Sequence, residues 1–411
     1  MKKIYSKISK CRISGDKNLI NICKFGNIKL TGIFPRNKKK LIDETPLQVV
    51  FSRKSKLLQL NHNYNLPKLF GNNYGYRSGL NTSMVQHLKK KYLKLNKKLK
   101  LGSKDKILDI GSNDGTFLNF FSKKSLRVGC DPTSKKFGKY YDQSIKKIPN
   151  IFNKYSSNKI NGKFKLISSI AMFYDLSNPL EFCNLVEKKL EKNGIFHVEI
   201  AYLPFILKTY SFDTFCQEHL TYFSLKSFEN LIKQTSLKIL DYETNPINGG
   251  SISFDLALKA SNHKVNKKKL VRLRKYESEN KVNSLPNLIK FFKKVKKNII
   301  HIEKKIKSLN GNVHGFGAST KGNVTLQLCK LTNKEIVSIY DINKDKFGSY
   351  TPGSNIKIIS ESRINKDKPK NLVFFIWHFK KTIAEKLKKF NLRKTNYIWL
   401  FPKYKVIKSK N

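Results

Sequence analysis

The stretch from Lys106 to Gly115 constrains the fold of this chain more than any other segment. Lys106 to Ile110 is typical of a buried strand, and the turn Gly111 to Gly115 is followed by a segment expected to be helical from Thr116 to Lys123. Further strands are expected from Leu126 to Asp131, from Phe164 to Ile170 and from Gly194 to Glu199. Because strands and helices alternate, we predict an α/β fold with an open, doubly wound parallel sheet.

Other regions flank this predicted sheet on both sides. Roughly the first 70 residues are short segments broken by Gly, Pro, Asn and Lys, which predicts a small, irregular, β-rich module. From Asn81 to Lys98, apolar residues recur at helical spacing, so a helix is expected to lead into the first strand.

The C-terminal part of the chain predicts a second α/β unit. Leu288 to Leu309 carries one apolar stripe on a lysine-rich helix, which we interpret as an amphipathic connecting helix rather than a polyanion-binding one. From Asn312, a strand, the glycine-rich turn Gly315 to Ala318, a helix and a strand ending in Asp341 form a nucleotide-binding layout. The predicted domains are therefore residues 1–75, 76–260 and 261–411.

The formal net charge of +55 on 411 residues would ordinarily suggest a nucleic acid or an anionic membrane as the partner. Only nine of the 83 basic residues are arginine, and the lysines are spread along the whole chain, which favours a solvated lysine-rich surface. No nucleic-acid partner is expected. No apolar run has the length of a signal peptide or a membrane span, so we expect a cytoplasmic protein without a membrane partner.

The turn after the first strand of the predicted sheet favours a positively charged nucleotide-like cofactor. Gly111 and Gly115 free the backbone for close approach of a ligand. Asp131 ends the next strand at the spacing, ~20 residues, at which a carboxylate binds a ribose diol. Two carboxylates, Asp109 and Asp114, suit the sulfonium of S-adenosylmethionine better than a pyrophosphate, so a dinucleotide is the second choice.

Six motifs occur in the order found in one known family. They are Tyr74 to Gly79, Leu108 to Thr116, Asp213 to Ser224, Asn248 to Ser251, Gly315 to Asn323 and Tyr350 to Gly353. The chain thereby resembles, over nearly its whole length, the deoxysugar C-methyltransferases that act on nucleotide-linked 4-keto sugars. This resemblance implies a Rossmann-like S-adenosylmethionine domain between a zinc-binding N-terminal module and a C-terminal α/β domain that grips the nucleotide sugar.

The chain departs from the family pattern at the N-terminal zinc site. The family uses two Cys-x-x-Cys pairs, whereas Cys11 here is matched with Ser14, and the second pair is Ser52 and Ser55. Serine is a poor zinc ligand, so neither zinc nor another metal is expected. The six cysteines lie far apart in the sequence, which predicts reduced thiols.

The resemblance also implies roles for individual residues. His219 is the expected base that forms an enolate, Glu218 orients it or binds sugar, and Tyr222 lies near the enolate oxygen. A purely structural Glu-His pair is the alternative. The cofactor-binding group is Tyr76, Arg77, Ser78, Asp109, Gly111, Ser112, Asn113, Gly115, Asp131 and Phe152. The substrate-binding group is Asn248, Gly249, Gly250, Gly315, Gly317, Lys321, Asn323 and Asp341.

We therefore expect an S-adenosylmethionine-dependent C-methyltransferase acting on a nucleotide-linked 4-keto sugar. Two further departures, the loop Ala171 to Asp175 without the family's histidine and Cys216 in place of tyrosine, leave the sugar open. The nucleotide, the methylated carbon and the oligomeric state also stay open. The alternatives are a methyltransferase acting on another small molecule or on RNA, and a non-catalytic cofactor-binding protein.

Overall fold

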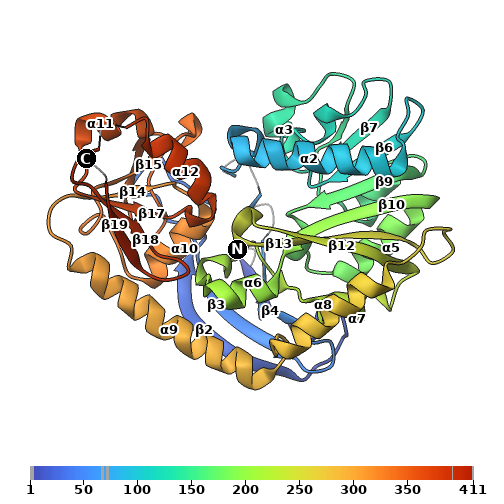
Figure 1. The fold of residues 1–411 in the computed structure, drawn as a ribbon, viewed down its shortest axis with the longest axis horizontal. Coiled ribbons are helices and arrows are strands. Elements are labelled where there is room, and N and C mark those ends of the chain that lie inside the picture. The colour runs from blue at the N-terminus through green and yellow to red at the C-terminus, as the bar shows by residue number, and fades with distance from the viewer. Residues whose placement is uncertain (1–3, 66–68, 71–73, 391, 410–411) are drawn as a thin grey trace.

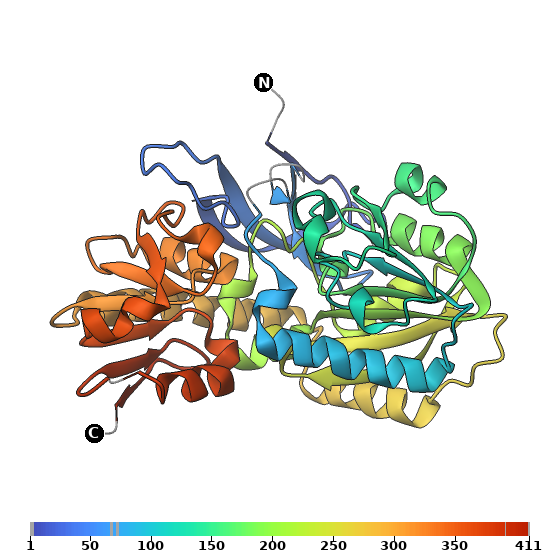
Figure 2. The same cartoon turned by 90° about the horizontal axis from the view of Figure 1, so that it is seen from above.

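Three large sheets and one two-stranded sheet organise the computed structural model, which describes residues 4–65, 69–70, 74–390 and 392–409. In Figure 1 the central domain lies on the right and the C-terminal domain on the left, and the long helix α9 (Leu285–Lys307) runs beneath toward the C-terminal domain. Seen from above, the N-terminal strands lie behind both domains (Figure 2). The α/β architecture with a β-rich N-terminal part is as the sequence predicts.

The central sheet has seven strands in the order β12-β13-β10-β9-β6-β7-β8. Strands β6, β7, β8, β9 and β10 run parallel, and β13 is antiparallel to both of its neighbours. Their bounds are β6 Lys106–Ile110, β7 Leu126–Cys130, β8 Lys146–Ile148, β9 Phe164–Ile170, β10 Leu190–Ala201, β12 Leu237–Asn245 and β13 Ser251–Leu258. The predicted parallel sheet is confirmed, with an antiparallel edge.

Helices cover this sheet and connect its strands. They are α2 Thr82–Leu99, α3 Ser134–Phe137, α4 Lys154–Asn158, α5 Pro179–Lys189, α6 Leu203–Thr209, α7 Leu225–Ile232 and α8 Lys267–Glu279. The helix predicted from Thr116 to Lys123 is wrong, because only a short 3-10 turn, Leu118–Phe120, forms there. The carbonyl oxygens of Leu118 and Phe121 accept hydrogen bonds from the buried Arg127 guanidinium instead of continuing a helix.

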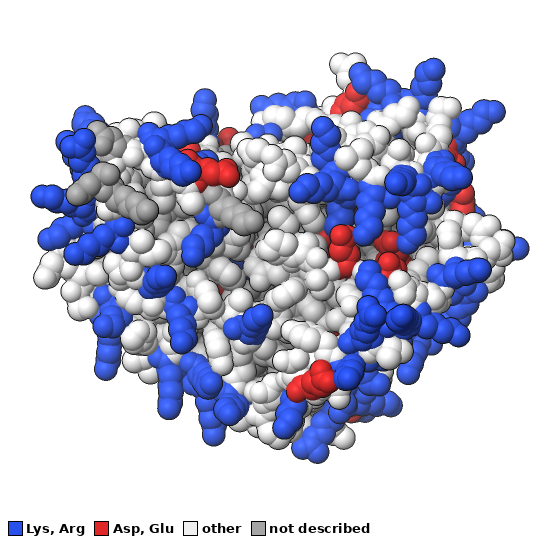
Figure 3. Space-filling view, in the orientation of Figure 1, with Lys and Arg blue, Asp and Glu red and all other residues white. Residues whose placement is uncertain are grey.

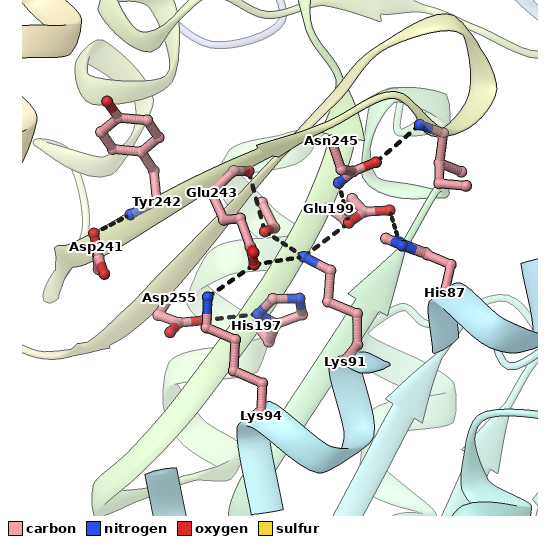
Figure 4. Close-up of polar contacts among 12 residues, drawn as sticks. His87, Lys91, Lys94, His197, Glu199, Asp241, Tyr242, Glu243, Asn245 and Asp255 are labelled. Atoms are coloured by element: carbon pink, nitrogen blue, oxygen red, sulfur yellow. Dashed lines mark hydrogen bonds and ion pairs between the residues drawn. The ribbon is translucent and has the colours of Figure 1, made fainter. Parts of the chain in front are cut away.

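Helix α2 is held on the sheet by a polar network as well as by apolar packing (Figure 4). The Lys91 ammonium lies 3.1 Å from a carboxylate oxygen of Glu199 and donates to Ser253 at 2.7 Å. His87 contacts the other oxygen of Glu199 at 2.8 Å. Met84 and Leu88, which lie on the same helix, are buried in the apolar core between this helix and the sheet. The network therefore fixes the helix that follows the segment Tyr74 to Leu80.

The N-terminal part contains a regular sheet rather than the irregular module expected. Its order is β11-β4-β3-β2, and β1 pairs with β5 beside it. The bounds are β1 Tyr5–Lys7, β2 Leu19–Lys29, β3 Glu44–Ser52, β4 Leu58–Leu60, β5 His62–Tyr64 and β11 Thr221–Tyr222. Strand β11 comes from the Asp213 to Ser224 motif, so this motif is joined to the N-terminal sheet.

The four positions that correspond to the family's zinc ligands do come together in space. Cys11 Sγ lies 3.2 Å from Ser55 Oγ, Ser52 donates to Asp16 at 3.0 Å, and the Asp16 amide donates to Ser14 at 3.4 Å. Because three of the four side chains are hydroxyls already in hydrogen bonds, the donor set does not fit zinc. Across the described ranges, no three His, Cys, Asp or Glu side chains are arranged to hold a metal.

The C-terminal domain is the second α/β unit that the sequence predicts. Its sheet has the order β16-β15-β14-β17-β18-β19, parallel except for β19. The strands are β14 Val313–Phe316, β15 Ser338–Asp341, β16 Lys357–Ser360, β17 Asn371–Phe374, β18 Asn396–Trp399 and β19 Lys405–Lys408. The helices are α10 Thr320–Leu328, α11 Ile364–Asp367 and α12 Lys380–Leu387.

A single hydrophobic core joins the C-terminal domain to the N-terminal sheet. The apolar stripe of α9, including Leu288, Val295 and Ile302, is buried between them. On the face seen in Figure 3, lysine and arginine side chains are spread around the periphery rather than gathered into one patch. Within the part of the chain that is described, no helix is long and apolar enough to cross a membrane.

Candidate functional site

A cavity of about 360 Å³ opens at the carboxyl ends of β6, β7 and β9. Its walls come from the segment before α2, the turn after β6, the ends of β7 and β9, and helix α5. The acidic side chains that line it are Asp109, Asp114, Asp131, Asp175 and Glu181. No lysine, arginine or histidine lies among the described residues that line it, so the cavity favours a cationic ligand.

The turn after β6 forms the floor of the cavity. Gly111 has φ of +81°, and a side chain there would meet Met172 at 2.9 Å. Gly115 has φ of +76°, and a Cβ there would lie 2.6 Å from the Tyr141 ring. Gly111 lines the cavity, whereas Gly115 makes room for Tyr141, whose hydroxyl donates to the Asn113 carbonyl at 2.9 Å.

Asp131 at the end of β7 holds this turn in place. One carboxylate oxygen accepts the Asn113 backbone N–H at 2.9 Å, and the other accepts the N–H and hydroxyl of Thr133 at 2.6 Å each. The oxygen bonded to Asn113 accepts only this one hydrogen bond, so it can still accept a further one from a ligand hydroxyl. Burial raises the pKa of Asp131.

Asp109 lies behind the turn, in the floor between β6 and β9. Its carboxyl is buried and accepts a hydrogen bond from the Ser168 hydroxyl at 2.6 Å. Burial, with a smaller contribution from the charge of Asp131, raises the pKa of Asp109 to about 7. This carboxyl therefore changes charge near neutral pH.

The segment Tyr76 to Gly79 is bonded to the turn from the other side. The amide of Ser78 donates to Asn113 Oδ1 at 2.9 Å, and Asn113 Nδ2 donates to the Tyr76 carbonyl at 3.3 Å. Tyr76 and Ser78 line the cavity. The Arg77 guanidinium instead stacks on the Tyr140 ring, 3.9 Å from its centre. Its side chain therefore holds the segment from a position that does not line the cavity.

Of the predicted cofactor-binding group, the structure brings eight residues to the cavity wall. They are Tyr76, Ser78, Asp109, Gly111, Ser112, Asn113, Asp131 and Phe152. Arg77 and Gly115 lie behind the wall. Phe152 makes an edge-to-face contact with Phe182, with ring centres 5.3 Å apart, and both rings line the same side.

The loop that carries Glu218 and His219 is fastened to the loop after β9. The Tyr174 carbonyl accepts the Leu220 amide at 2.9 Å and the Thr221 hydroxyl at 3.0 Å. His219 Nδ1 lies 2.9 Å from the Thr214 carbonyl, and its ring is 4.6 Å from the Tyr174 ring. This arrangement leaves His219 Nε2 as an unprotonated acceptor.

Glu218 is buried against the N-terminal part of the chain. One carboxyl oxygen accepts a hydrogen bond from the Thr31 hydroxyl at 3.2 Å. The other oxygen occupies the space that a side chain at Gly32 would fill. That other oxygen, Oε1, is buried and has no hydrogen-bond partner among the described residues. Burial raises the pKa of Glu218. The buried hydroxyl of Tyr222 likewise lacks a partner within the described part of the chain.

Asp175 is the site residue that sequence reasoning missed. It ends the short turn Phe173–Asp175 after β9, lines the cavity, and is electrostatically coupled to Glu218. Burial raises its pKa well above the usual range. The available signal was its position, since it follows a parallel strand at the same sheet edge as Asp109 and Asp131.

Part of the predicted substrate-binding group meets at the contact between the central and C-terminal domains. Lys321 at the start of α10 donates to the Asn248 carbonyl at 2.7 Å. A side chain at Gly249 would lie 3.1 Å from the Trp377 ring, and Gly250 abuts Phe205. The positive charge of Lys321 also acts on His219. Burial and, after it, this charge lower the pKa of His219 to about 3.

The remaining predicted residues surround the turn after β14. Gly315 packs against Ile339 and Phe375, and Gly317, with φ of +90°, packs against Ile376. Asp341 accepts the Ala318 amide at 2.8 Å and the Asn343 amide at 2.7 Å, the same pattern as Asp131. Asn323 donates to the Thr31 carbonyl at 2.7 Å.

Comparisons with known proteins place two matches along the chain. Residues 82–242 match the family model described as a methyltransferase domain, and residues 246–402 match the C-methyltransferase C-terminal domain. The chain is 28% identical to the C-methyltransferase NovU of Streptomyces niveus over 419 aligned positions, covering 100% of both chains.

Solved methyltransferase structures resemble part of the chain at low identity. An S-adenosylmethionine-dependent methyltransferase from Clostridium acetobutylicum is 17% identical, covers 42% of this chain and 92% of its own, and has a TM-score of 0.34. A putative methyltransferase from Bacillus halodurans is 11% identical, with coverages of 41% and 99% and a TM-score of 0.33.

Proposed function

We propose that this protein is an S-adenosylmethionine-dependent C-methyltransferase. The observation that carries the proposal is the cavity lined by five carboxyl side chains, without a basic one among its described lining residues, beside the Glu218-His219 loop. S-adenosylmethionine is cationic at sulfur and at its amino group, and a pyrophosphate would be repelled there. The residues fit the cofactor, because the Asp131 oxygen bonded to Asn113 retains acceptor capacity for a ribose hydroxyl.

The two family matches and the similarity to a C-methyltransferase support transfer to carbon. The methyl acceptor, on this proposal, is a nucleotide-linked 4-keto sugar. Three buried polar atoms have no partner among the described residues: Glu218 Oε1, Tyr222 Oη and Asp213 Oδ1. They favour a neutral group that carries hydroxyls, as the sugar part does. Lys321, whose charge acts on Asp213, supplies a positive charge for the nucleotide part.

His219 Nε2 accepts the proton from the carbon beside the ketone of the sugar. Its Nδ1–H stays bonded to the Thr214 carbonyl, so the ring keeps its orientation as the proton moves. The Tyr222 hydroxyl donates to the enolate oxygen, and Glu218 holds a sugar hydroxyl. The bound cofactor supplies an electrophilic methyl group for the enolate carbon.

The test is an incubation of the purified protein with methyl-labelled S-adenosylmethionine and a panel of nucleotide-linked 4-keto sugars. We expect label in one sugar, joined by a new carbon–carbon bond that NMR locates. Label on oxygen or nitrogen, or label in RNA or in another small molecule, would reject the assignment. Binding of cofactor without transfer to any acceptor offered would favour the non-catalytic alternative.

A further inference from the structure

Asp175 lies at the boundary between the acidic cavity and the Glu218-His219 loop. It lines the cavity, and the carbonyl of the preceding residue, Tyr174, accepts hydrogen bonds from Leu220 and Thr221 of that loop. A methyl group that passes from the cavity to the acceptor must cross this boundary. This inference rests on the proposed function.

The Asp175 carboxyl is placed where it can contact a ligand in the cavity. The side chain is partly exposed, and it lines the cavity, while its Oδ1 is shielded from solvent and lacks a hydrogen-bond partner in the described part of the chain. An unsatisfied buried carboxyl oxygen costs free energy that a bound cation or hydrogen-bond donor recovers.

The groups that face Asp175 are acidic or neutral. Glu218 on the neighbouring loop raises its pKa further, after the larger effect of burial. The other coupled groups are the phenols of Tyr74, Tyr174 and Tyr222 and the thiol of Cys216. Asp109, Asp131 and Glu181 line the same cavity. Burial and these neighbours therefore favour the protonated, uncharged form of Asp175 in the ligand-free protein.

We propose that Asp175 loses its proton when the cationic cofactor binds, and that the resulting carboxylate makes the site prefer S-adenosylmethionine over S-adenosylhomocysteine. The O–H bond of the carboxyl breaks, its proton goes to solvent, and the carboxylate pairs with the positive sulfur. The product has a neutral sulfur and gives the carboxylate no such partner. Asp175 then takes up a proton again, and the whole cycle releases the one proton removed from the acceptor carbon.

The test is titration calorimetry of the full chain with each of the two ligands at pH 7, in phosphate and in Tris. Comparing the two buffers, which differ in ionisation enthalpy, gives the number of protons released. For the wild type we expect about one proton released per S-adenosylmethionine, close to none with S-adenosylhomocysteine, and a preference of about tenfold or more for the former. Asp175→Asn should bind both ligands about equally and lose the release.

The control variant is Glu279→Gln, which removes an exposed carboxylate on α8 that does not line the cavity and that pairs with Lys275. It should keep the wild-type proton release. Equal release with both ligands in the wild type, or release that survives in Asp175→Asn, would assign the proton elsewhere and overturn the inference. The wild-type comparison decides the matter even if the variant folds poorly. Failure of the wild type to bind either ligand would instead count against the proposed function.

Discussion

The carbonyl oxygen of Thr214 lies 2.9 Å from Nδ1 of His219 and determines which ring nitrogen can act as a base. Nδ1 carries the hydrogen in this contact, so the lone pair is on Nε2. Burial, followed by the charge of Lys321, lowers the pKa of the ring to about 3. The ring is therefore neutral, with the Nε2 lone pair free, throughout the range above about pH 4.

Replacing His219 should abolish methyl transfer without weakening cofactor binding. For His219→Gln we expect kcat to fall by a factor of about 100 or more, because general base catalysis is lost, with an unchanged Kd for S-adenosylmethionine by calorimetry. His263→Gln, at a partly exposed histidine outside the candidate site, should behave as wild type. Near wild-type turnover of His219→Gln would leave the base unassigned.

Lys321 connects the C-terminal domain to the chemistry of His219. Lys321→Met should raise KM for the nucleotide sugar by about tenfold, because a point charge beside the nucleotide is lost, and leave cofactor affinity unchanged. The same change should raise the pKa of His219, since a nearby cation is removed. On the acid side of the pH profile, the activity of the variant would then begin to decline at a higher pH than that of the wild type. Lys334→Met, at an exposed lysine, is the control.

The sequence predicts most accurately what is set by local pattern. The bounds expected for β6 and β9 agree with the structure because their buried apolar residues and flanking turns are contiguous. The helix expected after Gly115 fails because its carbonyls are taken by Arg127, a residue on the next strand. A hydrogen bond from a side chain on the following strand to these carbonyls leaves no periodic signal in the sequence.

In the candidate site, too, some residues could be predicted from their own segment, whereas others depend on contacts with distant segments. Asp109 and Asp131 could be placed at one cavity because both end parallel strands of one sheet. Asp175 was missed because its importance depends on Glu218, 43 residues away in sequence, and on the bonds between their two loops. The pairing of Thr221 with Gln59 likewise joins distant segments, so the regular N-terminal sheet could not be read from either one.

Asp109 should make the stability of the ligand-free protein depend on pH. Its pKa is raised to about 7 in the folded chain, so its contribution to stability is complete below about pH 4 and is lost as pH rises through about 7. The free energy of unfolding measured in urea should decrease over this pH window, and Asp109 should account for at most about 4 kcal/mol of the decrease. Asp109→Asn should flatten the decrease, whereas exposed Glu279→Gln should not.

Removing metal should leave the protein unchanged. Cys11 faces Ser55 at 3.2 Å, and Ser52 is bonded to Asp16, so hydrogen bonds occupy the positions of the family's zinc ligands. We expect Tm and methyl transfer to be the same before and after dialysis against a chelator, with negligible zinc by elemental analysis. A stoichiometric metal content, or a fall in Tm on chelation, would contradict this reading of the N-terminal sheet.

Lys91 and Lys94 on α2 offer a matched comparison of a buried and an exposed ion pair (Figure 4). Lys91 is 4% exposed and lies 3.1 Å from Glu199, a buried carboxylate whose pKa is lowered to about 2, first through the His87 hydrogen bond and then through Lys91. Lys94 is half-exposed and pairs only with Glu243, itself partly exposed, at 2.8 Å among the described contacts.

Breaking the buried pair should therefore cost far more than breaking the exposed one. Lys91→Met leaves Glu199 charged in the interior, and we expect the free energy of unfolding in urea to fall by about 3 kcal/mol. Lys94→Met should cost less than about 1 kcal/mol. Because α2 also carries Met84 and Leu88 of the cavity wall, Lys91→Met should weaken cofactor binding as well. Equal effects of the two variants would mean that apolar packing alone holds α2 on the sheet.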